Sequence, residues 1–143
     1  MPSLERTALV SHSAKQMFDL VNDVDAYPEF LPWCSGASTL ERGDGFNIAR
    51  VNMKKGPLSQ HFTTRNELAE GESISMTLVD GPFKKLNGKW TFSEIGDLGC
   101  KVSFSIDFAF SGFILEKTLG PLFNEICGRM VDAFVGRANQ VYG

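Results

Sequence analysis

Hydrophobic residues recur along this chain with two different periods, and the period indicates which segments are strands and which are helices. The clearest two-residue period lies between residues 100 and 110, where every second residue is apolar: Cys100, Val102, Phe104, Ile106, Phe108 and Phe110. Such alternation is typical of a strand with one face in the core and one in water. Shorter runs of the same kind contain Ile74, Met76 and Leu78, and then Leu86, Gly88, Trp90 and Phe92.

Turn signals separate the alternating runs between about residues 36 and 110, and no connection there is long enough for a helix. Examples are Gly43 to Gly45, Gly56 with Pro57, and Gly81 with Pro82. Short connections join neighbouring strands as antiparallel hairpins. Together with a short strand at residues 3 to 10, the pattern predicts an antiparallel sheet of six or seven strands.

Two short helices are predicted after the first strand. Ser13 and Gln16 have the spacing of a capping box, which satisfies free backbone amides where a helix begins. Apolar residues follow at helical spacing before Asn22, at Ala14, Met17, Phe18 and Val21. A second helical piece is expected from Asp25, with Pro28 in its first turn, where the missing N–H costs little.

The last region, from about residue 113, returns to the helical period. Its wide apolar stripe contains Leu119, Leu122, Phe123, Ile126, Cys127, Met130, Val131, Phe134, Ala138 and Val141. A helix of about 20 to 25 residues, roughly 30 to 38 Å long, is expected. Gly120 and Pro121 predict a kink or a late start, and Gly128 predicts a close approach of another backbone.

These elements predict an α+β fold in a single domain over residues 1–143, with a curved antiparallel sheet wrapped around a long C-terminal helix. A helix about 10 Å wide cannot fill the whole concave face of such a sheet. The chain contains 12 Phe, many of them at inward positions. Two interpretations stay open, because these rings either line an apolar pocket or simply fill the core.

Composition and charge limit the possible partners. The 143 residues are 43% hydrophobic and 22% charged, as in ordinary globular proteins. The net charge of -3 argues against a generic basic nucleic-acid-binding module, so DNA is not an expected partner. A signal peptide and an apolar stretch of membrane-spanning length are both absent from the sequence, which favours a cytoplasmic protein.

The titratable residues do not form a recognisable catalytic or metal-binding motif. Cys34, Cys100 and Cys127 are widely spaced and form no CxxC pair, so we interpret them as reduced, buried thiols. The two histidines, His12 and His61, have no nucleophile motif nearby. The sequence therefore predicts a protein that is not an enzyme and needs no catalytic cofactor or metal.

Three segments resemble one known family. They are DVDAYPEFLPWC at residues 23–34, DGPFKKLNGKWTF at 80–92 and MVDAFVGRANQVYG at 130–143. They are similar to the coenzyme Q-binding and ribosome association toxin RatA family, part of the helix-grip superfamily of START and birch-pollen-allergen-like domains. Some members of that superfamily are labelled polyketide cyclases or dehydrases, which would give Arg65, Glu67 or Asp107 an acid-base role. Asp107, however, falls on the polar face of its strand, where solvent exposure is expected.

The resemblance implies a hydrophobic tunnel between the sheet and the long helix that holds ubiquinone or a similar isoprenoid lipid. It implies a role in respiratory quinone function, with transient contact to a membrane surface. This ligand-binding role is the main interpretation, and the resemblance also implies an alternative, in which the protein binds the large ribosomal subunit and blocks the association of the subunits. Both functions are compatible with one protein.

The expected ligand-binding residues are mainly aromatic and lie on inward positions. They are Phe18, Tyr27, Phe30, Leu31, Trp33, Met76, Leu78, Phe83, Trp90, Phe92, Phe104, Phe108, Phe123, Ile126, Met130 and Phe134. Tyr27 and Trp33 carry an apolar body and a polar end, which suits the mouth of a pocket, although a structural lid over the core is the alternative.

Four lysines beside predicted turns are candidates for surface contact. Lys54, Lys55, Lys84 and Lys85 would form a basic patch at one end of the sheet, facing an anionic membrane or ribosomal RNA. The alternative is that they are solvated ends of strands.

Overall fold

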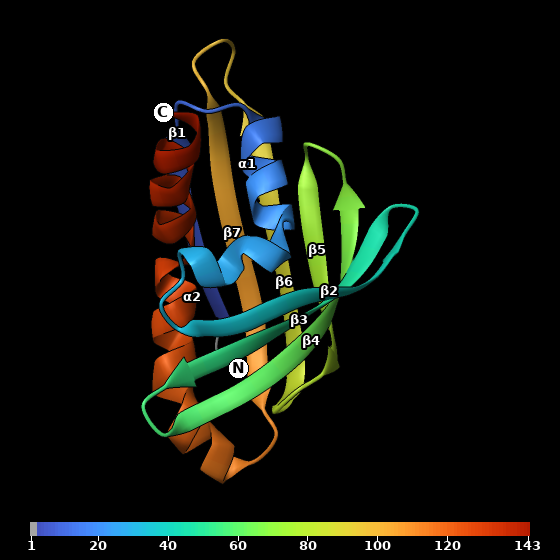
Figure 1. Cartoon of the computed structure of the whole chain (residues 1–143), viewed down its shortest axis with the longest axis vertical. Coiled ribbons are helices and arrows are strands. Elements are labelled where there is room, and N and C mark those ends of the chain that lie inside the picture. Colours follow the sequence, from blue (N-terminus) through green and yellow to red (C-terminus); the bar gives the residue numbers. More distant parts are fainter. Residues whose placement is uncertain (1–2) are drawn as a thin grey trace.

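A computed structural model describes residues 3–143 as a curved sheet that wraps around one long helix (Figure 1). The chain order is β1 (Ser3–Val10), α1 (Ala14–Asn22), the short 3-10 helix η1 (Val24–Glu29), β2 (Cys34–Gly43), β3 (Phe46–Lys55), β4 (Leu58–Ala69), β5 (Ser73–Asp80), β6 (Phe83–Glu94), β7 (Cys100–Phe110) and α2 (Phe113–Tyr142). Every neighbouring pair of strands is antiparallel, in the order β1-β7-β6-β5-β4-β3-β2. The predicted architecture and the upper strand count are confirmed.

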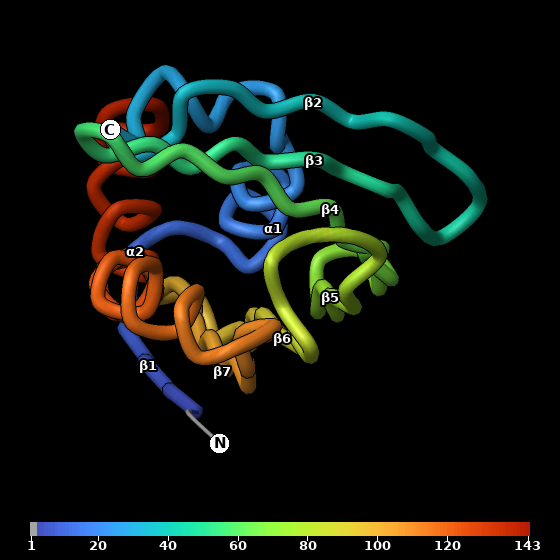
Figure 2. Tube along the Cα trace, turned by 90° about the horizontal axis from the view of Figure 1, so that it is seen from below, coloured from blue at the N-terminus to red at the C-terminus, as the bar shows by residue number. Residues whose placement is uncertain are grey.

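The sheet bends sharply between its two halves. In Figure 1, β2, β3 and β4 cross the direction of β5, β6 and β7 at a steep angle, and Figure 2 shows the strands curling around the helices. Register shifts interrupt the pairing of β4 with β5 at Thr63/Thr64 and of β2 with β3 at Cys34/Gly36 and Thr39/Glu41. A bulge of this kind bends its strand and increases the local twist, which accounts for the deep curvature.

The N-terminal helices follow the sequence pattern closely. The side chain of Ser13 accepts a hydrogen bond from the Gln16 backbone, and the Gln16 side chain accepts one from the Ser13 backbone, so the capping box is present. The helix α1 buries its predicted apolar residues. In η1, Pro28 lies in the last turn and not in the first as predicted, because the 3-10 helix begins one residue earlier and is only 6 residues long.

The helix α2 is longer than predicted, with 30 residues beginning at Phe113. It passes through Pro121 without ending, because Gly120 has no Cβ to clash with the proline ring. The first turns, before Leu119, are mostly exposed and carry no apolar stripe, and the kink or late start predicted from Gly120 and Pro121 left them out of the expected length. Gly128 meets no backbone; the nearest atom to its Cβ position is Arg6 Nη2 at 3.8 Å, so the predicted close approach is wrong.

The core lies between the concave face of the sheet and α2. All apolar residues of the β7 alternation are buried, and Asp107 is exposed as predicted. The three cysteines are free and buried, which confirms their interpretation as structural thiols. Phe123 of α2 packs among the rings of Phe62, Phe83, Phe108 and Phe110.

Candidate ligand-binding site

An open groove runs between α2 and the near ends of η1 and β3. Its volume is about 640 Å³. The floor is apolar and the rim is charged, with the lining formed by Leu31, Pro32, Trp33, Lys54, Lys55, Leu122, Glu125, Ile126, Arg129, Asp132 and Ala133. An apolar floor of this size with a polar rim is typical of a site for a small hydrophobic molecule.

A second, much smaller space lies inside the core, between the sheet and α2. Its volume is about 70 Å³. Besides Trp33 and Ile126, it is lined by Val24, Tyr27, Ala49, Val51, Phe62, Thr64, Asn66, Met76, Leu86, Trp90, Phe104, Ile106, Phe123, Cys127 and Met130. A space of this size holds about two water molecules, so side chains fill most of the interior. The space suited to a larger ligand is the outer groove.

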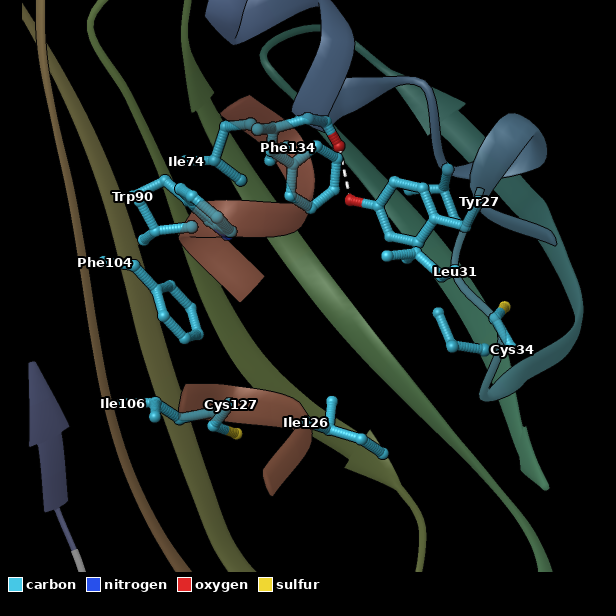
Figure 3. Close-up of a cluster of buried hydrophobic side chains, with 14 of the residues drawn as sticks. Tyr27, Leu31, Cys34, Ile74, Trp90, Phe104, Ile106, Ile126, Cys127 and Phe134 are labelled. Atoms are coloured by element: carbon cyan, nitrogen blue, oxygen red, sulfur yellow. Dashed lines mark hydrogen bonds between the residues drawn. The ribbon is translucent and has the colours of Figure 1, made fainter. Parts of the chain in front are cut away.

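Trp33 and Ile126 line both the groove and the inner cavity. Trp33 is half-buried in the connection between η1 and β2, whereas Ile126 is buried on α2. Figure 3 shows Ile126 and Cys127 on the α2 ribbon and Trp90, Phe104 and Ile106 on the strands opposite. These two side chains therefore form the partition between a surface groove and the core.

The expected ligand-binding residues fall into two groups. Eight of them line the inner cavity: Tyr27, Trp33, Met76, Trp90, Phe104, Phe123, Ile126 and Met130. Leu31 lines the groove. The remaining seven, which border neither space, are Phe18, Phe30, Leu78, Phe83, Phe92, Phe108 and Phe134. Six of these pack ring against ring, for example Phe18 with Phe92 at 6.0 Å between centroids.

Tyr27 differs from its expected place at a pocket mouth. Its ring is buried against Phe134, with 5.3 Å between the centroids, and its hydroxyl donates a 2.5 Å hydrogen bond to the Val21 carbonyl (Figure 3). Burial raises the pKa of this phenol well above its ordinary value, with the neighbouring Cys34 and Asp23 acting in the same direction. Tyr27 therefore joins η1 to α1, and only Trp33 of the predicted pair lies at the groove.

The four lysines do not share one environment. Lys54 and Lys55 line the groove, and Lys55 forms an exposed ion pair with Glu125 at 3.5 Å between Nζ and Oε2. Lys84 is exposed at the start of β6, and Lys85 is half-buried. A common basic patch of all four lysines stays a prediction.

A chain of buried polar side chains reaches the inner cavity and was missed in the sequence. The Thr64 hydroxyl donates to Asn66 Oδ1 at 2.9 Å, Asn66 Nδ2 to Asn47 Oδ1 at 2.8 Å, and Asn47 Nδ2 to Asn22 Oδ1 at 2.9 Å. Asn47 is only 1% exposed. The alternation along β3 could have predicted that Asn47 is buried, because Asn47 lies on the same face of the strand as Ala49, Val51 and Met53.

The inner cavity is electrically neutral. Its lining within the described residues 3–143 includes no carboxylate, histidine, lysine or arginine. Burial raises the pKa of the Cys127 thiol to about 12, so this cysteine is uncharged near neutral pH. Such a cavity suits a small uncharged molecule, and Thr64 and Asn66 are among the polar side chains in its lining. The described residues also lack any cluster of three or more potential metal ligands.

Comparison with known proteins gives relatives along the whole chain. The profile of the family described as polyketide cyclase / dehydrase and lipid transport matches residues 10–135. A Vibrio cholerae protein named ribosome association toxin RatA is 50% identical over 143 residues, covering 100% of this chain and 99% of the relative. A Xenopus laevis protein named coenzyme Q-binding protein COQ10 homolog B, mitochondrial, is 27% identical over 140 residues, covering 94% of this chain and 57% of the relative.

Solved structures confirm the helix-grip fold. The solution structure of an 18 kDa protein from Caulobacter crescentus has a TM-score of 0.76 and 35% identity, covering 100% of this chain and 99% of that one. The crystal structure of the Zhui aromatase/cyclase from a Streptomyces species has a TM-score of 0.82 at 17% identity, covering 99% and 96%. Among residues 3–143, no helix combines the length and the hydropathy needed to cross a bilayer.

Proposed function

Because this chain belongs to the RatA and coenzyme Q-binding family, within the polyketide cyclase / dehydrase and lipid transport group, we propose that it controls ribosome association. In this proposal the protein binds the large ribosomal subunit and blocks its joining to the small subunit. The supporting observation is the 50% identity to a ribosome association toxin, which extends over all 143 residues. A cytoplasmic location and a non-catalytic mode of action follow from this proposal.

Sedimentation of ribosomal subunits tests the proposal directly. Purified protein is added to separated subunits under conditions that favour joining, and the profile is resolved on a sucrose gradient. We expect the joined ribosome peak to fall in proportion to added protein, with the protein migrating beside the large subunit. An unchanged profile at saturating protein would contradict the proposal.

A second function, binding of a hydrophobic ligand, is supported by the groove and the cavity. The groove has the volume of a small-molecule site, and an uncharged cavity lies directly behind its Trp33 and Ile126 wall. The distant coenzyme Q-binding relative makes ubiquinone or another isoprenoid lipid the first candidate. Such a carrier would receive its ligand at a membrane surface.

Mass spectrometry of an organic extract tests this second function. The protein is purified from a quinone-producing host without detergent, denatured and extracted into hexane. We expect an isoprenoid quinone or lipid in near-stoichiometric amount. A matched extract of the same chain refolded from denaturant in lipid-free buffer is the control, and equal signals from both samples would contradict a bound ligand.

A further inference from the structure

A polar depression lies on the outer face of the sheet, on the opposite side from the inner cavity. Its volume is about 420 Å³, and its lining is Ser35, Arg50, Asn52, Ser59, Gln60 and His61. All six side chains are polar, and none of them is a carboxylate. Arg50 and Asn52 alternate along β3 with residues that line the inner cavity, so the two sites use opposite faces of the same strand.

Glycine and a bulge create the depression. The register shift between Cys34 and Gly36 breaks the pairing of β2 with β3 beside it. Gly36 pairs with Asn52, and a Cβ at Gly36 would lie 3.0 Å from Asn52 Nδ2, so a side chain there would crowd the Asn52 amide. Asn52 Oδ1 is buried and has no hydrogen-bond partner among residues 3–143. The amide therefore retains unused hydrogen-bonding capacity beside an open space.

Two cations flank the depression along one strand. Arg50 and Lys54 are both exposed and occupy alternate outward positions of β3, with Asn52 between them. Their separation of four residues corresponds to roughly 13 Å along a strand. His61 and Ser59 face them from β4, opposite Asn52 and Lys54. Neither Arg50 nor Lys54 forms an ion pair with a carboxylate of residues 3–143, whereas Arg65 on the same hairpin pairs with Glu67 at 2.8 Å.

We propose that this surface, formed by Arg50, Asn52, Lys54, Ser59 and His61, binds the sugar-phosphate backbone of ribosomal RNA; the proposal rests on the ribosomal function proposed above. Arg50 and Lys54 neutralise phosphates within one stretch of backbone, the Asn52 Oδ1 accepts a hydrogen bond from a ribose hydroxyl, and Ser59 hydrogen-bonds to a ribose hydroxyl or a phosphate oxygen. Protein partners fit less well, because the centres of protein interfaces are apolar and aromatic, and no apolar side chain lines this depression.

A locally positive surface allows RNA binding by a chain whose net charge is negative. The net charge of -3 opposes general affinity for nucleic acid. Arg50 and Lys54, which form no ion pair within residues 3–143, lie among polar hydrogen-bonding side chains. They confine the contact with RNA to one short stretch of the sugar-phosphate backbone. Lys54 also lines the groove, so the proposed RNA surface and the groove meet at this residue.

Paired charge variants test this surface. The double variant R50A/K54A removes two positive charges from it, and the control K89A/K101A removes two exposed charges from β6 and β7. Each full-length protein is sedimented with purified large subunits over a series of salt concentrations. We expect R50A/K54A to bind on the order of tenfold to hundredfold more weakly, with the slope of log K against log salt reduced by about one for each lost phosphate contact. The control is expected to match the unsubstituted protein.

Each outcome of the experiment is decisive. Equal binding of large subunits by the two double variants overturns the assignment of the surface to RNA. Weaker binding by R50A/K54A with an unchanged salt slope also overturns it, because that result indicates a protein partner. If the unsubstituted chain does not bind large subunits at all, the proposed ribosomal function fails separately. The surface is then judged on fluorescently labelled oligouridylate at low salt, where a selective loss by R50A/K54A supports it and equal anisotropy for both variants overturns it.

Discussion

Trp33 and Ile126 are the two residues that border both the surface groove and the inner cavity. One side chain comes from the connection after η1 and the other from α2, more than 90 residues later in the sequence. The boundary between the groove and the inner cavity is therefore built from two elements that are distant along the chain.

Replacing Trp33 with Ala is expected to open that partition. Xenon bound in the cavity should exchange with the solvent faster in the variant, as measured by xenon-129 NMR, because the ring no longer separates the cavity from the groove. The free energy of unfolding should fall by only about 2 kcal/mol, since the lost side chain is half-buried. Phe113→Ala is the control, because Phe113 is 68% exposed and borders neither space. Equal xenon exchange rates for both variants would show that Trp33 is only a structural lid.

Replacing Gly88 of β6 with Ala is expected to push a neighbouring side chain into the inner cavity. A Cβ at Gly88 would lie 2.5 Å from Met76 Cε, the flexible end of a side chain that lines the cavity. Met76 should move into the free space, so xenon binding should weaken while stability rises by up to about 1 kcal/mol as glycine leaves the strand. Gly136→Ala is the matched control, because its Cβ would meet no atom within 4 Å. Undiminished xenon binding by Gly88→Ala would place the xenon outside the cavity.

The fold could be predicted from the sequence where burial follows a regular period. The alternation from Cys100 to Phe110 identified the buried face of β7, and the Ser13 capping box located the start of α1. The return to helical period near residue 113 matches the start of α2 at Phe113, whereas its length of 30 residues exceeds the expected 20 to 25, because Gly120 and Pro121 left a later start open and Phe113 and Ile114 are exposed.

The candidate site was less predictable because it depends on contacts between distant strands. Phe108 and Phe104 are equivalent positions of one alternation, yet only Phe104 borders the cavity. The difference arises from α2, where Phe123 packs on Phe108 at 4.7 Å between centroids. The inward polar residues Asn47 and Asn66 were missed because the runs of β3 and β4 mix polar and apolar side chains on the buried face.

Replacing Asn47 with Ala is expected to reduce stability strongly. The substitution leaves Asn66 Nδ2 and Asn22 Oδ1 without their partners. Unsatisfied buried groups of this kind cost about 1 to 3 kcal/mol each, so we expect a loss of about 2 to 5 kcal/mol in urea denaturation. Asn87→Ala, at an exposed position of β6, should change stability by less than about 0.5 kcal/mol. Similar values for the two variants would contradict a cooperative buried polar chain.

Stability is expected to fall at alkaline pH because of Cys127. Its thiol pKa is raised by burial from 9.0 to about 12 in the folded protein. Between these values the unfolded chain has lost the proton and the folded chain keeps it, so the free energy of unfolding decreases by up to about 1.4 kcal/mol per pH unit. Below the unfolded pKa this contribution is fully present. Urea denaturation from neutral to alkaline pH should show a shallower decline for Cys127→Ala than for the unsubstituted protein, and parallel curves would contradict the assignment.

The helix α2 and the β3–β4 hairpin form two walls of the groove, and they are packed against the rest of the protein with unequal strength. The backbone of α2 lies mainly against β7, β1 and α1, whereas the tip of the β3–β4 hairpin meets α2 through the exposed Lys55–Glu125 ion pair. Exposed pairs of this kind contribute at most about 1 kcal/mol. The wall formed by α2 is therefore fixed, and the wall formed by the β3–β4 hairpin is flexible. Widening of the groove bends the hairpin outward while the helix stays in place. The same hairpin carries Arg50 and Lys54 on its outer face, and loading the groove would therefore tilt the surface proposed to contact RNA.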